Sequence, residues 1–259
     1  MNKKLDSYLS IHPSIHPSNT HGFSDLKNMY QDFIVQKWSV WPPLEGQESD
    51  SLTQNELLSF VPRMLKRRLS PLARIVFCAA SQCVDQKTHL PAVFSSTHGE
   101  LAKSFKMMEM IEQGEEISPT AFSLSVHNSI AGLFAMAYKN KRQCVVVAPG
   151  EEGLAAAFIE AIGLLQEGAD EVLVVLYDEP LEAFYPSSPY KLSMPTSCAI
   201  ALRIGKTGSG TTLRLSVQSK AGDDGEQPLQ VPLMIQFLSG KQEKLILQTP
   251  RHSWCWEKR

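Results

Sequence analysis

The feature that most constrains the fold is a strand, turn, helix and strand pattern in the second half of the chain. Residues Gln143–Ala148 form a largely apolar run, Pro149-Gly150 breaks it, and residues Glu151–Glu167 form an alanine-rich helical stretch. Gly168 ends that helix, and Glu171–Leu176 is a second apolar run. Strands that are apolar throughout are typical of sheets covered on both faces. The pattern therefore predicts a βαβ unit, and with it a partly parallel sheet.

Further strands and helices are predicted around this unit. Ser70-Pro71 marks a helix start, because serine caps a helix and proline fits its first turn. Cys198–Ile204 and Leu213–Gln218 flank a glycine-rich turn and predict a β-hairpin. The other predicted elements are strands at Phe33–Val35, Pro91–Phe94 and Lys244–Leu247, and helices at Asn55–Leu65, Asn128–Tyr138, Leu233–Leu238 and Glu100–Gln113, the last with Phe105, Met108 and Ile111 on one face and methionines as core residues.

Composition and charge exclude several classes of function. The chain of 259 residues is 43% hydrophobic and 20% charged, and its net charge of −2 argues against a general nucleic-acid binder. No apolar run is long enough to span a bilayer, and the N-terminus lacks the pattern of a signal peptide. The five cysteines are scattered without a C-x-x-C pair, so we expect no disulfide framework, metal site or cofactor. We expect a cytoplasmic protein.

The first 28 residues differ from the rest. Two copies of Ile-His-Pro-Ser lie in tandem at residues 11–18, and their prolines support no regular packed element. A weak metal-binding role for this repeat is the alternative to a disordered tail. We expect residues 1–28 to be a disordered N-terminal extension and residues 29–259 to form one folded domain.

The most specific string is Ser-Pro-Thr-Ala-Phe-Ser-Leu-Ser-Val-His-Asn, at Ser118–Asn128. Ala131-Gly132, a helix and the βαβ pattern follow it. This order resembles the core of a β-ketoacyl synthase of the thiolase-like superfamily. The resemblance implies an α/β, thiolase-like fold, in which this chain is a single half-fold with a mixed, partly parallel sheet flanked by helices.

In ketosynthases the strand of this βαβ unit leads into a sharp turn, the nucleophile elbow. The elbow carries the catalytic cysteine at a helix N-terminus, where backbone N–H groups and the helix dipole favour a thiolate. Counting from Ala131-Gly132 and from Gly168 places Glu151 at that position, and Glu152 is the alternative if the turn is one residue longer. A carboxylate cannot form the acyl thioester. The resemblance therefore implies no catalytic residue at the elbow.

The positions of the histidines also argue against catalysis by this chain. Ketosynthases decarboxylate the malonyl unit with two histidines of a C-terminal half that this chain does not contain, and no histidine lies between His127 and His252. A lone histidine near a helix start is more often structural than catalytic. Such losses resemble the chain-length factors of type II polyketide systems, which dimerise with an active ketosynthase.

Among chain-length factors, this chain most resembles the short ones of aryl polyene biosynthesis. The residues that carry this resemblance are Trp38, Trp41, Arg68–Arg74, Gly99–Leu101, Ser118–Asn128 and the closing Trp254-Cys255-Trp256. Because the short family also ends near such a pair of tryptophans, we expect the chain to be complete.

The resemblance further implies an interface and a tunnel. In ketosynthase dimers the strand that enters the elbow pairs with its counterpart across the two-fold axis, and the partner's acyl tunnel runs to this interface. The implied interface residues are Cys144, Val145, Val146, Val147 and Ala148. The residues implied to set how long an acyl chain fits are Ala121, Phe122 and Leu124. The implied partners are a ketosynthase subunit and, through the complex, an acyl carrier protein.

The implied function is that of a non-catalytic chain-length factor in polyene, polyketide or fatty-acid-like chain elongation. Two alternatives remain open. One is a malonyl carrier-protein decarboxylase that uses Glu151 or His127, which would need an oxyanion hole and a proton source. The other is a purely structural protein that stabilises the ketosynthase without shaping its tunnel.

Overall fold

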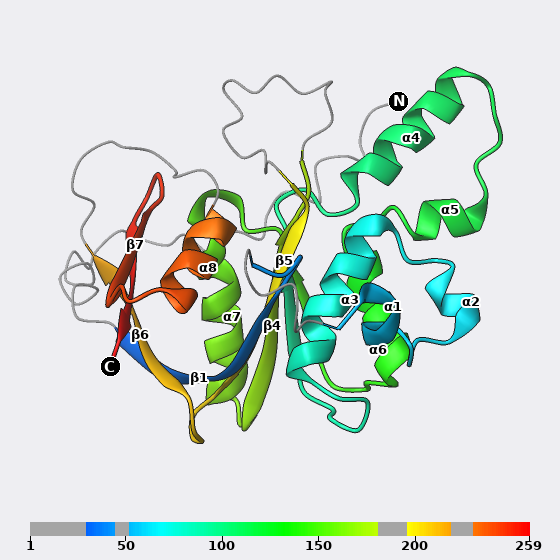
Figure 1. The fold of residues 1–259 in the computed structure, drawn as a ribbon. Helices are drawn as coiled ribbons and strands as arrows, with labels where there is room; N and C mark the ends of the chain where they lie inside the picture. Colours follow the sequence, from blue (N-terminus) through cyan, green and yellow to red (C-terminus); the bar gives the residue numbers. More distant parts are fainter. Residues whose placement is uncertain (1–29, 45–51, 181–195, 219–229) are drawn as a thin grey trace, which may run out of the picture.

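The computed structural model of the protein describes residues 30–44, 52–180, 196–218 and 230–259, so the extension expected at 1–28 lies outside the described residues. One eight-stranded sheet runs through the described chain, in the order β3-β2-β4-β5-β1-β6-β8-β7 (Figure 1). β2 is parallel to β3 and to β4, and the other neighbours are antiparallel. The predicted mixed sheet and the βαβ unit are confirmed. The strands are β1 (Tyr30–Trp41), β2 (Ala92–Ser95), β3 (Cys144–Val147), β4 (Glu171–Asp178), β5 (Cys198–Gly205), β6 (Thr211–Gln218), β7 (Lys244–Gln248) and β8 (Ser253–Lys258).

Helices cover both faces of the central strands. On one face lie α1 (Gln54–Leu57), α3 (Pro71–Cys83) and α6 (Ser129–Tyr138), and on the other lie α7 (Leu154–Gln166) and α8 (Gln230–Ser239) (Figure 1). Alternate residues of β4 face the two sides, since Val174 packs with α7 whereas Val175 packs with α3. Burial on both faces explains why this strand is apolar from Val172 onward.

The last strands extend the sheet and curl around α7. Trp256 of β8 is fully buried, and its ring lies 5.5 Å from that of Phe158 on α7. Leu213 and Leu245, from β6 and β7, pack in the same core cluster. Helix α7 therefore lies between the central strands and the β6–β8–β7 extension, as Figure 1 shows.

Two helices stand apart from both core layers. α4 (Leu101–Glu112) and α5 (Pro119–Ser123) have no buried residue, and Figure 1 shows them beside each other, with α4 extending away from the sheet. The expectation that the methionines of α4 are core residues is wrong, because Met108 is 51% exposed and Met107 and Met110 are half-buried. Ile111, from the same predicted face, is 62% exposed.

The predicted hairpin of residues 198–204 and 213–218 is also wrong in its pairing. Strand β1 lies between β5 and β6 and pairs with both. The glycine-rich turn passes over β1, since Gln36 donates from Nε2 to the carbonyl of Thr207 at 2.8 Å. A side chain at Gly210, where φ is +150°, would collide with the backbone of Val35. Local turn signals cannot reveal a third strand inserted from far away in the sequence.

The N-terminal elements differ from prediction in length. β1 spans twelve residues where three were predicted, because both of its edges are paired. The single helix predicted at Asn55–Leu65 is two short helices, α1 and α2 (Arg63–Lys66), and Pro62 stands directly before the second. Proline is compatible with a helix start but breaks a helix interior. The start of α3 is confirmed: the Ser70 Oγ accepts from the amide of Ala73 at 2.9 Å.

Candidate functional site

The carboxyl ends of the parallel strands β3, β2 and β4 lie side by side. The amide of Ser96, just after β2, donates to the carbonyl of Val147 at 3.3 Å. Asp178, the last residue of β4, accepts hydrogen bonds from the Ser96 hydroxyl at 2.8 Å and from the Thr97 amide at 2.9 Å. Burial raises the pKa of Asp178, against the opposing effect of these hydrogen bonds. In open α/β sheets this edge is where binding sites form.

The elbow follows β3 at this edge, but its geometry differs from the predicted one. Residues 151–153 are not part of the long helix: Gly150–Glu152 is a 3-10 turn, and α7 begins at Leu154. Gly153 makes the turn with φ of +57°, a conformation that favours glycine. The Leu154 amide donates at 2.8 Å to Oε1 of Gln230, a buried residue at the start of α8. The side chain of Gln230 therefore binds the first backbone N–H of α7. Glu151 lies before this helix and is not one of its first-turn residues.

Glu152, the alternative elbow residue, is held by the C-terminal hairpin. Its carboxylate accepts a hydrogen bond from Trp254 Nε1 at 2.8 Å and lies 3.2 Å from His252 Nδ1. The Thr249 hydroxyl is 3.5 Å from the same carboxylate. These contacts give Glu152 a structural role that the sequence did not indicate. The signal available was Trp254 of the closing tryptophan pair, because a buried indole N–H usually finds an acceptor.

His127 is likewise engaged with the backbone. Its Nε2 lies 2.9 Å from the carbonyl of Ser96, so this nitrogen donates. The imidazole packs against Gly99, where φ is +59° and an added Cβ would lie 2.8 Å from the ring. The geometry favours the structural interpretation of His127: the ring fastens the turn after β2.

Strand β3 is an edge strand that is open on one side. It pairs with β2 alone among the described strands, and all four of its residues are half-buried. An apolar Cys-Val-Val-Val edge is the kind of surface that proteins normally cover. Burial raises the pKa of Cys144 to about 11, so its thiol stays neutral near pH 7. The predicted interface residues Cys144 to Val147 thus form one continuous edge, and Ala148 follows it.

A pocket of about 660 Å³ lies between α4 and α5. Ala121 and Leu124, two of the residues expected to limit chain length, are among its lining residues. Phe122 is not, and its side chain is 60% exposed. The other lining residues come from α4 and the segment after it: Lys103, Lys106, Met107, Glu109, Met110, Gln113 and Glu115. Sequence reasoning missed Met107 and Met110, although their spacing with Lys103 places them on one helix face.

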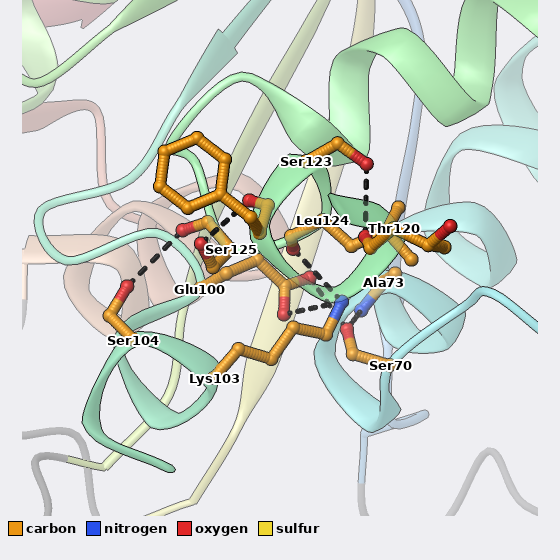
Figure 2. Close-up of polar contacts among 10 residues, drawn as sticks. Ser70, Ala73, Glu100, Lys103, Ser104, Thr120, Ser123, Leu124 and Ser125 are labelled. Atoms are coloured by element: carbon orange, nitrogen blue, oxygen red, sulfur yellow. Dashed lines mark hydrogen bonds and ion pairs between the residues drawn. The ribbon is translucent and has the colours of Figure 1, made fainter. Parts of the chain in front are cut away.

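Polar contacts hold the α5 segment, which we define as residues 118–125, against α4 and α3 (Figure 2). The buried carboxylate of Glu100 accepts from the Ser70 hydroxyl at 2.6 Å and lies 3.1 Å from Lys103 Nζ. Lys103 Nζ also donates to the Leu124 carbonyl at 3.2 Å. The Ser104 hydroxyl donates to the Ser125 carbonyl at 3.2 Å. The wall of the pocket is thereby fixed to a core helix.

Between Pro149 and Leu154 the elbow holds no cysteine, serine or threonine. Among the described residues, no group of three or more His, Cys, Asp or Glu side chains could hold a metal ion. Nor does the described chain include a helix long and apolar enough to cross a membrane.

Solved structures with this fold are known. A ketosynthase (ApeO) in complex with its chain length factor (ApeC) from Xenorhabdus doucetiae matches at a TM-score of 0.65 and 24% identity, over 88% of this chain and 97% of that chain. The ishigamide ketosynthase/chain length factor matches at a TM-score of 0.48 and 16% identity, over 64% of this chain and 51% of that chain. Among curated proteins no sequence matches significantly.

The thiolase-like fold expected from the sequence is therefore confirmed. The family model for the N-terminal domain of β-ketoacyl synthases matches residues 38–257, which include every described strand and helix from β2 to β7. The chain belongs to the β-ketoacyl synthase N-terminal domain family.

Proposed function

We propose that this chain is a non-catalytic chain-length factor that pairs with an active β-ketoacyl carrier-protein synthase and shapes its acyl tunnel. The observation that carries the proposal is the combination of an open apolar edge strand, β3, with an elbow that lacks a nucleophile. At that elbow, Gln230 accepts a hydrogen bond from the Leu154 amide, and Trp254 donates one to Glu152. A chain that needs a partner along β3 but cannot form an acyl thioester fits a partner subunit.

Pairing along β3 would satisfy two needs at once. The unpaired backbone groups of an edge strand require hydrogen-bond partners, and its valines lose water contact when a second strand covers them. A second copy of such a strand from the ketosynthase supplies both. Each unsatisfied backbone group that gains a partner contributes about 0.5–1.5 kcal/mol.

The pocket between α4 and α5 is the proposed end of the acyl tunnel. Ala121 and Leu124 line it together with Met107 and Met110, and these four side chains offer apolar surface to a growing chain. One methylene more or less changes affinity in such a pocket by about 1–3 kcal/mol, which is enough to terminate elongation at a preferred length. Phe122, exposed beside the pocket, is proposed to complete the wall once the partner is bound.

The finer parts of the proposal rest on the sequence resemblance. We propose aryl polyene biosynthesis as the setting, an acyl carrier protein as the donor of the chain through the complex, and the cytoplasm as the location. Residues 29–259 would form the ketosynthase-like domain and residues 1–28 an extension outside it.

Co-expression with the cognate ketosynthase tests the proposal. We expect a heterodimer in native mass spectrometry, and products whose length shifts when Ala121 is changed to Phe. A stable monomer that leaves the ketosynthase's product lengths unchanged would overturn it.

The two alternatives make different predictions. A decarboxylase would release carbon dioxide from malonyl carrier protein with this chain alone, whereas we expect no mass change in the malonyl group. A purely structural stabiliser would leave product lengths unchanged in the complex of the Phe122→Ala variant. Because Phe122 is 60% exposed, this substitution should alter the free energy of unfolding by no more than about 0.5 kcal/mol.

A further inference from the structure

The distance between α4 and α5 decides how deep the pocket is, and apolar packing alone does not fix that distance. Both helices lack buried residues, and the half-buried Leu124 is the apolar side chain of the α5 segment that packs against the core cluster of α3 and α6. The pocket takes Met107 and Met110 from α4, and Ala121 and Leu124 from the α5 segment. Any movement of the α5 segment relative to α4 therefore changes the pocket directly.

A charged contact joins the two sides. Lys103 of α4 donates from Nζ to the Leu124 carbonyl at 3.2 Å, and the same Nζ lies 3.1 Å from Glu100 Oε2 (Figure 2). The ion pair itself joins Lys103 to Glu100, and the hydrogen bond from the same Nζ connects that pair to the α5 segment. Leu124 is at once a lining residue of the pocket and the residue whose carbonyl Lys103 holds. Hydrogen bonds from charged donors are about twice as strong as neutral ones.

The other end of this contact is anchored in the core. Glu100 is only 3% exposed, and its Oε1 accepts from the Ser70 hydroxyl at 2.6 Å. Ser70 in turn caps α3, the helix that packs against β1, β4 and β5. A surface ion pair would contribute little, but removing the partner of a buried charge is costly because that charge is left uncompensated. A chain of polar contacts through Ser70, Glu100 and Lys103 therefore connects α3 to the pocket wall.

We propose that Lys103, itself a lining residue of the pocket, is also a positioning residue, which holds the α5 segment at a fixed distance from α4 and so sets the acyl chain length that the pocket admits. We call the set Ser70, Glu100, Lys103 and the Leu124 carbonyl the Lys103 bridge. The neutral hydrogen bond from Ser104 to the Ser125 carbonyl supports the same segment but does not reach the buried carboxylate. This inference rests on the proposed function, because it needs the pocket to be the end of the tunnel.

The central experiment compares product lengths from the heterodimer that contains the Lys103→Met variant. Methionine keeps most of the aliphatic stem but cannot donate to the Leu124 carbonyl or pair with Glu100. We expect the ratio of longer to native-length products to rise by about tenfold, the lower end of what one methylene is worth in an apolar pocket. Lys103→Arg, which keeps both the charge and the donors, is expected to restore the native distribution.

Hydrogen exchange gives a readout that does not depend on the ketosynthase. The amides of Leu124 and Ser125 donate to carbonyls within the α5 segment. In Lys103→Met their exchange should accelerate by about tenfold, as expected for the loss of one charge-assisted hydrogen bond. Glu112→Gln, on an exposed residue of the same helix that does not line the pocket, removes a charge and serves as the control with native behaviour.

The outcomes distinguish the proposed role of the Lys103 bridge from the proposed role of the pocket as the end of the tunnel. If Ala121→Phe shifts product length but Lys103→Met does not, the bridge is overturned while the proposed function stands. If neither variant shifts product length in an intact heterodimer, the tunnel role fails and the bridge fails with it. Should Lys103→Met not pair with the ketosynthase, Glu100→Gln replaces it. Native product lengths with native exchange in Glu100→Gln would then contradict the proposal.

Discussion

Trp254 donates a hydrogen bond from its indole Nε1 to the carboxylate of Glu152 at 2.8 Å, across 102 positions of sequence. The contact joins the elbow after β3 to the β7–β8 hairpin. Trp254 is only 7% exposed, so its N–H has little access to water. Glu152, at one of the two candidate nucleophile positions, therefore has a structural role.

Replacing Glu152 should destabilise the fold. In Glu152→Ala the buried indole N–H loses its acceptor, and we expect the free energy of unfolding to fall by about 1–3 kcal/mol. Glu152→Gln keeps a carbonyl acceptor and should cost less. Urea denaturation measures both, with Glu167→Ala, at an exposed residue just after α7, as the control. Equal stability of Glu152→Ala and the control would contradict this role.

The open edge of β3 can be blocked without disturbing its pairing with β2. The carbonyls of Gln143 and Val147 accept hydrogen bonds from the β2 side, so alternate residues direct their backbone groups to β2. The backbone of Val146, one position away from this set, therefore points to the open edge.

Val146→Pro is thus expected to fold normally but to pair poorly with the ketosynthase. Proline removes the outward N–H, and edge strands tolerate proline. An unmade backbone hydrogen bond costs about 1–3 kcal/mol, so the dissociation constant should rise about tenfold to a hundredfold. Val146→Ala keeps the N–H and is the matched control. Native mass spectrometry or calorimetry measures the affinity, and undiminished pairing of Val146→Pro would exclude β3 as the interface.

Met110, a lining residue that sequence reasoning did not identify, should control product length. Met110→Trp fills the pocket and is expected to lower the yield of the longest product at least about tenfold, whereas Met110→Ala should lengthen the products. Because Met110 is half-buried outside both core clusters, its substitution should change stability little. Chromatography of products from the heterodimer decides. Identical product profiles for both variants would place the length limit elsewhere.

The junction between the central strands and the extension should show a pH-dependent stability. Asp32 of β1 and Arg214 of β6 stand opposite each other and form two hydrogen bonds at 2.7 and 2.8 Å. The hydrogen bond from Arg214 lowers the pKa of Asp32 below its ordinary value of 3.8. The resulting stability is present above that ordinary value and is lost as pH falls through the lowered one.

Asp32→Asn should therefore reduce the free energy of unfolding near pH 7, but by less than about 1 kcal/mol, because the pair is partly exposed to solvent. The difference from the unmodified protein should disappear as the pH falls below the lowered pKa. Urea denaturation at pH 7 and at successively lower pH measures it. A difference that stays constant with pH would show that charge is not its cause.

Local patterns predicted the regular core well. The two apolar runs around an alanine-rich helix are β3, α7 and β4, and the Ser70-Pro71 cap starts α3, because these features depend on residues close in sequence. The pairing of β5 and β6 with β1 was not predictable in this way, since the strand between them comes from the N-terminal part of the chain. The amphipathic pattern of α4 gave its helical state but not its exposure, which depends on what packs beside it.

The sequence by itself determined the family, the βαβ unit and the absence of a nucleophile at the elbow, because residue types and short spacings carry that information. Only the tertiary structure decided that Gln230 and Trp254 occupy the elbow, that β3 lies at an open edge, and that Lys103 joins buried Glu100 to the pocket wall. The physical reason is that these contacts join separate elements, in most cases far apart in sequence. Their geometry follows from the order of strands in the sheet and from which side chains are removed from water, neither of which a local pattern specifies.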